Sequence, residues 1–147
     1  MELSKRTDLA FRTLIYLAVI DNKRVTIMDI SKAYNAPKSH LMKVVNSLVH
    51  AGFINAVRGK NGGISLAYPA NKIALNSIIE AIEPTLTPID CVKQKCAIDG
   101  HCKLPKILSN AQQAYLNELK KFTLADIIAP TTAQTLQLTS ISIGVNL

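Results

Sequence analysis

The sequence predicts a mostly α-helical fold with one small β-hairpin, arranged as a winged helix-turn-helix followed by a long dimerisation helix. Two short helical patterns joined by a tight turn precede two alternating apolar segments around a basic, glycine-rich tip. A longer helical pattern follows in the second half of the chain. A chain of 147 residues, 48% of them hydrophobic, is long enough to form one domain with its own core.

The net charge of +7 comes entirely from the first half of the chain. Residues 1–72 contain 11 Lys and Arg against 4 Asp and Glu, whereas residues 73–147 contain 6 of each. This asymmetry predicts that the first half binds a polyanion. Nucleic acid is favoured over a membrane, because the sequence has no long basic amphipathic segment and no lipidation signal. The odd number of cysteines and the lack of a recognisable secretory signal predict a reducing, cytoplasmic location.

The first expected helix spans residues 7–20, where apolar side chains recur at mixed steps of three and four. Either Thr7 or Asp8 is its expected N-cap, since both side chains accept hydrogen bonds from free backbone N–H groups. The carboxylate of Asp8 also suits the positive end of the helix dipole.

Residues 26–52 are typical of a helix-turn-helix. Thr26 and Asp29 resemble a capping box, and Gly52 suits the end of the second helix. In such a motif the N-terminal residues of the second helix enter the DNA major groove. The candidate DNA-binding residues on this helix are Lys38, Ser39, His40 and Lys43. An ordinary helical hairpin with a solvated basic face is the alternative interpretation.

The side chains of this second helix suggest distinct roles on DNA. Lys38 and His40 are expected to donate hydrogen bonds to guanine acceptors, while Ser39 suits a phosphate or a base edge. Lys43 lies about one helical turn further along the chain.

Residues 53–57 and 64–68 alternate like two strands, and the segment RGKNGG between them predicts the tip of a hairpin. A basic hairpin directly after a helix-turn-helix predicts a winged helix. Arg58 is expected to enter a minor groove and Lys60 to contact phosphate. A nucleotide-phosphate loop is the alternative. It is disfavoured because a P-loop lies between a strand and a helix.

The rest of the chain divides into a connecting region, a long helix and a tail. The expected organisation is a DNA-binding domain over 1–72, a connecting helix and cysteine loop over 73–103, a dimerisation helix and short helix over 104–128, and a tail over 129–147. The connecting helix is expected at 75–83. The tail has no charged residue from position 131 onwards, which is compatible with disorder or with an added strand.

The long helix is expected over residues 104–121. Apolar side chains recur along it at steps of three and four, at Leu104, Leu108, Ala111, Tyr115, Leu119 and Phe122. Such a line on a small chain predicts packing against the same helix of a second copy, and a symmetric dimer suits a helix-turn-helix that reads two half-sites. A helix folded back on its own domain is the alternative.

All three cysteines lie in the segment CVKQKCAIDGHC, at Cys91, Cys96 and Cys102. Their spacing differs from the paired CxxC knuckles of structural zinc and from the runs of bacterial ferredoxins. Three thiolates suit a soft metal centre and leave one coordination position for a weaker ligand. The neighbouring lysines at positions 93, 95 and 103 are expected to lower the thiol pKa values. Unrelated free thiols are the alternative.

The order of these motifs resembles the winged-helix iron-sulfur repressors of bacteria, and among them the nitric-oxide-sensing NsrR branch. The resemblance covers residues 1–128 and rests mainly on VRGKNGG, IEP, the three-cysteine segment and TLADI. It implies a homodimer with a [4Fe-4S] or [2Fe-2S] cluster on Cys91, Cys96 and Cys102. It further implies binding to an inverted-repeat operator and release of the DNA when nitric oxide attacks the cluster.

The resemblance also bears on the fourth ligand. In the cluster-assembly branch, IscR, a histidine three residues after the third cysteine completes the ligand set, and this chain has Pro105 there. Some NsrR proteins use an aspartate from the partner subunit at the start of the first helix. Asp8 stands in the matching position, with Asp99 and His101 as rivals.

Three other interpretations stay open at this stage. One is an iron-sulfur regulator of the same type that responds to iron or to cluster assembly, and a second is a zinc- or thiol-based redox regulator. The third is a cluster-bearing electron carrier. An enzyme or carrier is disfavoured, because the sequence has no nucleotide fingerprint and such a protein has no use for a basic first half.

Overall fold

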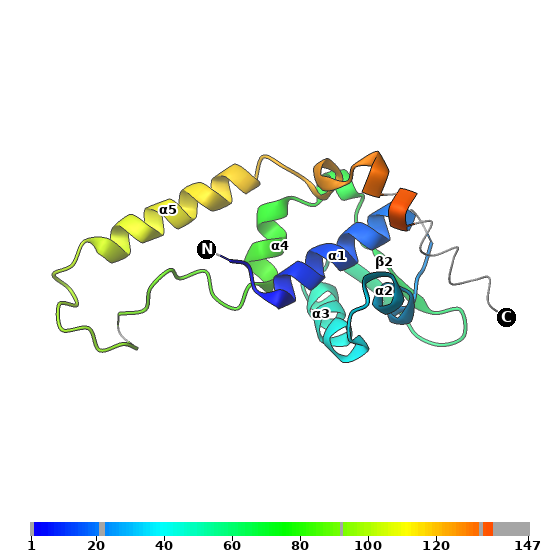
Figure 1. Cartoon of the computed structure of the whole chain (residues 1–147), viewed down its shortest axis with the longest axis horizontal. Helices are drawn as coiled ribbons and strands as arrows, with labels where there is room; N and C mark the ends of the chain where they lie inside the picture. Colours follow the sequence, from blue (N-terminus) through cyan, green and yellow to red (C-terminus); the bar gives the residue numbers. More distant parts are fainter. Residues whose placement is uncertain (1, 21–22, 92, 133, 137–147) are drawn as a thin grey trace.

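The computed structural model describes residues 2–20, 23–91, 93–132 and 134–136 and is mostly helical, with one two-stranded antiparallel hairpin (Figure 1). This confirms the predicted fold class. The elements in chain order are α1 (Lys5–Ile20), α2 (Ile27–Tyr34), α3 (Lys38–His50), β1 (Ile54–Val57), β2 (Gly63–Leu66), the 3-10 turn η1 (Ala70–Lys72), α4 (Leu75–Ile82), α5 (Leu104–Leu119) and the 3-10 turn η2 (Leu124–Ile127).

Helix α1 begins earlier than the sequence predicted. The Ser4 hydroxyl accepts the Thr7 N–H at 3.3 Å, and the Ser4 carbonyl accepts the Asp8 N–H at 3.0 Å, so Ser4 caps the helix. The expected N-cap at Thr7 or Asp8 is therefore wrong, because both residues lie inside the first turn. The Glu83 carboxylate, 79 positions away, accepts the Ser4 N–H at 3.2 Å and also the hydroxyls of Ser4 and Thr7.

The helix-turn-helix forms from the local signals that the sequence contains. Thr26 and Asp29 make a complete capping box at the start of α2. Asn35 adopts a left-handed conformation with φ of 48° and ends that helix, and Gly52, with φ of 81°, follows the end of α3. The shared core has side chains from α1, α2, α3 and α4; its largest fully buried apolar members include Leu14, Ile30, Leu41, Leu48 and Ile78.

The wing is a regular two-stranded hairpin, and Val25 forms an isolated bridge to the outer edge of β2. β1 and β2 pair antiparallel from Ile54↔Leu66 to Val57↔Gly63. Val25 exchanges two hydrogen bonds with Ile64, at 3.0 and 2.8 Å. At the tip, a Cβ on Gly62 would lie 2.4 Å from the Val57 carbonyl oxygen, so the turn requires glycine there.

The second half of the chain leaves the body and returns to it. α4 packs into the core, whereas α5 projects away, with residues 84–103 forming the connection at its far end (Figure 1). After α5 the Leu75 N–H donates to the Phe122 carbonyl at 3.0 Å and the Leu124 N–H donates to the Ile73 carbonyl at 2.8 Å. These bonds fix the C-terminal end of α5 to the segment between η1 and α4.

The described part of the tail is helical at residues 130–132 and 134–136, and Leu136 is buried. The strand that the sequence allowed is therefore not found in this part, and residues 137–147 lie outside the described residues. None of the described helices has the length and hydropathy that crossing a bilayer requires.

Candidate functional site: a basic winged helix and a cysteine loop

The four residues predicted to bind DNA from α3 all lie on its exposed face. Lys38, Ser39, His40 and Lys43 are exposed, whereas Leu41 and Val44 of the same helix are buried. Among the described residues, none of the four side chains has a hydrogen-bond or ion-pair partner. The helix thus presents cations and hydrogen-bond donors that have no role within the fold.

Two further residues on this face escaped the sequence analysis. Met42 is 47% exposed, and Asn46, one turn further on, is exposed too. The thioether side chain suits apolar contact with a thymine methyl group, and asparagine suits the N6 and N7 edge of adenine. Their spacing from Ser39, at i+3 and i+7, was the available signal.

The wing presents its two predicted cations at the tip. Arg58 and Lys60 are exposed, and neither has a salt-bridge partner among the described residues. Gly59, with φ of 96°, and the turn bond from the Gly62 N–H to the Gly59 carbonyl, at 2.9 Å, hold the tip in a tight loop. Both cations therefore lie on a short, conformationally defined loop.

The cysteine loop forms a series of turns between α4 and α5. The Cys96 N–H donates to the Cys91 carbonyl at 3.2 Å, and the Leu104 N–H, at the start of α5, donates to the Cys102 Sγ at 3.4 Å. Among the described residues from 91 to 103, the three cysteines alone are half-buried, and all the others are exposed. The thiols are therefore less accessible to solvent than the other described side chains of the loop.

The electrostatics of this loop differ from the prediction for its lysines. Burial, followed by the nearby Cys96, Asp99, Cys102 and Asp90, raises the pKa of the Cys91 thiol above its ordinary value. Lys93 lies 3.3 Å from Asp90 in an exposed ion pair. For Cys91 the expected lowering of the pKa is therefore wrong, because burial disfavours the thiolate and the neighbouring cysteines and carboxylates add to that effect. A metal centre would have to displace this thiol proton.

The donor set of the loop fits a soft metal centre in its chemistry, although its side chains are not gathered around one point. Three half-buried thiols are the ligands that iron-sulfur clusters use. In the part of the chain that the structure describes, no three His, Cys, Asp or Glu side chains lie close enough to hold a metal ion. Cys91, Cys96 and Cys102 would hold the group after a rearrangement of the loop's turns.

The three candidates for a fourth ligand have different surroundings. Asp8 lies on the first turn of α1 and pairs with Arg12 at 2.9 Å, with both side chains about half exposed. Asp99 accepts the Gly100 N–H at 3.1 Å within the loop, and His101 is exposed beside Cys102. The arrangement within one chain does not distinguish among them.

Helix α5 leaves much of its apolar line uncovered. Leu116 is its one buried residue, whereas Leu104 and Ile107 near its start are 46% and 61% exposed. Phe122, just beyond its end, is 45% exposed. An apolar surface of this kind is typical of an interaction site.

Comparisons with known proteins agree with this architecture. The profile of the Rrf2 family, described as iron-dependent transcriptional regulator, matches residues 3–130. The solved structure of CymR (YrzC), the global cysteine regulator of B. subtilis, superposes with a TM-score of 0.70 at 21% identity and covers 86% of this chain and 95% of that one. T. potens IscR gives 0.66 at 21% identity, with 86% and 85% covered. The oxidized form of Staphylococcus aureus CymR gives 0.63 at 25% identity, with 84% and 93% covered.

Proposed function

Because the chain belongs to the Rrf2 family of transcriptional regulators, we propose that it is a repressor that senses nitric oxide through an iron-sulfur cluster and releases operator DNA when the cluster is lost. The observation that carries the cluster proposal is that Cys91, Cys96 and Cys102 are half-buried, whereas the other described residues from 91 to 103 are exposed. When bound, the cluster supplies iron that nitric oxide attacks.

Operator binding is assigned to the free cations and donors of α3 and the wing. In this proposal Lys38, His40 and Lys43 approach base edges and phosphates from the recognition helix. Arg58 and Lys60 extend the contact to the neighbouring backbone or minor groove. The excess charge of +7 in residues 1–72 provides the salt-dependent part of the affinity.

The homodimer is assigned to α5. The exposed apolar side chains of Leu104, Ile107 and Phe122 would be removed from water by the same helix of a second copy. Two-fold symmetry would then present two recognition helices to an inverted repeat. The fixed C-terminal end of α5 would transmit the dimer geometry to both DNA-binding halves.

Asp8 is the proposed fourth ligand, contributed to the loop of the partner subunit. It has two alternative partners, the Arg12 guanidinium in its own helix and that loop. The Asp8–Arg12 pair is half exposed and of the i,i+4 type, which is worth about 0.3–0.5 kcal/mol. Arg12 thus holds the carboxylate only weakly, so Asp8 can leave Arg12 for the loop of the partner subunit at small cost in free energy.

A thiol-based redox regulator is the second candidate. It is favoured by the presence of all three thiols within twelve residues of an exposed loop, and by the similarity to a CymR whose structure exists in an oxidized form. In this function the same loop would respond by oxidation of its sulfurs, with no metal.

The test is anaerobic purification followed by nitric oxide titration of visible absorption and of operator binding on the same sample. A coloured protein that loses its absorption and its DNA together supports the cluster function. Cys96→Ala should give folded protein without the cluster absorption and with weak operator binding, and the matched control Ala97→Ser should behave like the unmodified chain. A colourless protein that binds and releases DNA on thiol oxidation would favour the second candidate.

Two variants distinguish between Asp8 and Asp99 as the fourth ligand. Asp8→Asn and Asp99→Asn are matched variants that each remove one carboxylate charge. Loss of the cluster in Asp8→Asn alone supports the proposal, whereas loss in Asp99→Asn alone assigns the ligand to the loop.

A further inference from the structure

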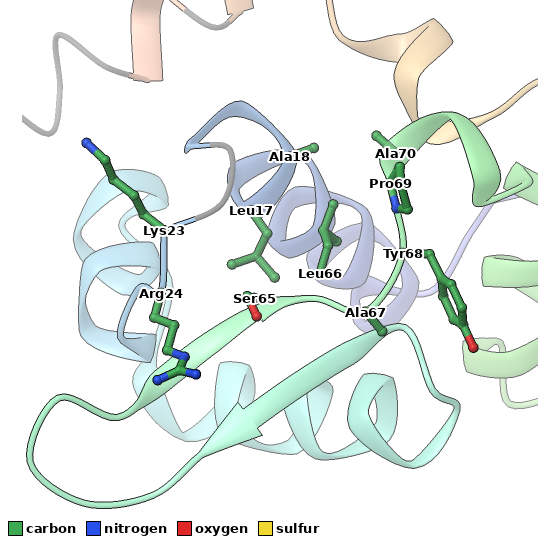
Figure 2. Close-up of a pocket in the computed structure, with 10 residues that line it drawn as sticks. All are labelled: Leu17, Ala18, Lys23, Arg24, Ser65, Leu66, Ala67, Tyr68, Pro69 and Ala70. Carbon is green, nitrogen blue, oxygen red and sulfur yellow. The ribbon is translucent and has the colours of Figure 1, made fainter.

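A pocket of about 560 Å³ opens between the C-terminal half of α1 and the outer edge of β2, away from the residues assigned above (Figure 2). Its volume lies within the range of about 300–1,000 Å³ that small-molecule sites occupy. Leu17, Ala18 and Pro69 provide apolar walls, while Arg24, Lys23 and Ser65 provide donors. The pocket thus combines a small apolar surface with two cations and a hydroxyl group among its lining residues.

The edge of β2 that faces this pocket lacks a partner strand. In the antiparallel ladder, the N–H and C=O groups of Ile64 and Leu66 point away from β1. Ile64 bonds to Val25 in both directions, but the backbone of Leu66 has no hydrogen-bond partner among the described residues. If the pairing of Val25 with Ile64 continued in register, Lys23 would lie opposite Leu66. The pocket opens where the segment before Val25 instead diverges from the edge of β2. One donor and one acceptor are therefore available there.

The charged side chains around the pocket all have the same sign. No Asp or Glu is among its lining residues, and neither Lys23 nor Arg24 forms a salt bridge in the described part of the chain. The Ser65 hydroxyl adds a further donor without a partner among the described residues. This donor set is complementary to an anion.

The pocket is directly connected to the wing. A Cβ on Gly63, the first residue of β2, would lie 3.2 Å from the Arg24 Cβ and 2.8 Å from the Val25 carbonyl oxygen. Figure 2 shows the Arg24 side chain lying over the hairpin. A molecule bound to Arg24 would therefore contact the base of the wing.

We propose that this pocket binds a small organic acid that also carries a hydrogen-bond donor, such as an amino or hydroxy carboxylic acid. The carboxylate pairs with the Arg24 guanidinium and the Leu66 N–H, with Lys23 at the rim. The amino or hydroxyl group donates to the Leu66 carbonyl, and the carbon skeleton contacts Leu17 and Pro69. The proposal is independent of the cluster and of the identity of the signal that the cysteine loop senses.

The test is calorimetric titration of the full-length protein with L-serine, L-malate and L-lactate, each compared with its carboxamide and with inorganic phosphate. At least one acid should bind saturably and more tightly than its amide. Arg24→Gln should weaken that binding about tenfold or more, the factor expected for one charge-assisted hydrogen bond. Lys60→Gln, which removes a wing-tip cation outside the pocket, is the matched control and should leave it unchanged.

Hydrogen exchange locates the ligand. Bound acid should slow amide exchange in the segment 65–68 and leave the segment 91–103 unchanged. The proposal is overturned if no acid binds saturably, if Arg24→Gln binds as well as the unmodified chain, or if inorganic phosphate binds equally well. Protection of 65–68 by operator-length DNA alone would instead assign the pocket to the DNA backbone, and would also overturn it.

Discussion

The bond network of Glu83 gives the sharpest test of how the cysteine loop is joined to the DNA-binding half. Its carboxylate accepts the Ser4 N–H at 3.2 Å, the Ser4 hydroxyl at 3.1 Å and the hydroxyl of Thr7, which is fully buried. In a capping box a carboxylate three residues into the helix accepts the N-cap N–H. Here Glu83 has that role from the end of α4, directly before the loop.

Glu83→Ala should lower the free energy of unfolding by about 2–3 kcal/mol. Loss of a cap bond costs about 1 kcal/mol, and hydrogen bonds to a charged group contribute about 1.5–3 kcal/mol when buried, less here because the network is partly exposed. At about 2–4 °C per kcal/mol for a chain of this size, the melting temperature should fall by about 5–10 °C. Urea and thermal unfolding at one fixed protein concentration measure both quantities.

A double-mutant cycle separates the bond from other effects of the substitution. Glu80→Ala is the matched control on the same helix. Glu80 is exposed, and within the described part of the chain its side chain bonds only to the Asn76 side chain, at 3.2 Å, so this change should cost less than about 0.5 kcal/mol. Thr7→Val should cost less in the Glu83→Ala background than alone, because both partners are then gone. The reasoning fails if Glu83→Ala is as mild as Glu80→Ala, or if the coupling between Thr7 and Glu83 is zero.

Three further predictions follow from single side chains. Lys60→Ala should reduce the slope of log affinity against log salt for operator DNA by about 0.9, and Lys121→Ala should leave it unchanged. Replacing one operator thymine by deoxyuracil should weaken binding roughly fourfold, which is the effect of about 0.8 kcal/mol for one methyl group. Met42→Ala should abolish that difference. If the variant still distinguishes thymine from deoxyuracil, Met42 does not contact the methyl group. The Thr123 N–H and hydroxyl donate hydrogen bonds to Asp126 and lower the pKa of its carboxyl group. The ionised carboxylate therefore stabilises the fold at pH values above the pKa that Asp126 has in the unfolded chain. This stabilisation is lost as the pH falls through the lower pKa of the folded protein. Asp126→Asn should therefore be less stable near neutral pH in urea unfolding, with the difference disappearing in acid.

Local signals in the sequence were sufficient for the winged helix. The Thr26 and Asp29 capping box, the left-handed Asn35 and the glycines of the wing act within a few residues of where they stand. Such features depend on short-range backbone geometry, so the pattern alone identifies them. The family match over residues 3–130 agrees with that prediction.

Features that depend on long-range contacts could not be predicted in this way. The sequence placed the start of α1 two residues too late, because the true cap uses Ser4 together with Glu83 from the other end of the domain. The raised pKa of the Cys91 thiol had the same origin, since it depends on which side chains surround Cys91 and not on the local count of lysines. The pocket beside Leu66 arises because the segment with Lys23 and Arg24 diverges from the edge of β2, and no residue pattern in the sequence predicts this divergence.

The position of Glu83 explains how a change in the loop can be separated from unfolding of the DNA-binding half. Before it, Ile78, Ile79 and Ile82 of α4 are buried in the shared core. After it, the described residues from 93 to 101 are exposed except Cys96, so few core contacts are lost when the loop rearranges. The Glu83 carboxylate joins this boundary to the first turn of α1, which also contains Asp8. A regulator that alters its loop and keeps its fold needs such a boundary, and the Glu83→Ala variant tests whether it is there.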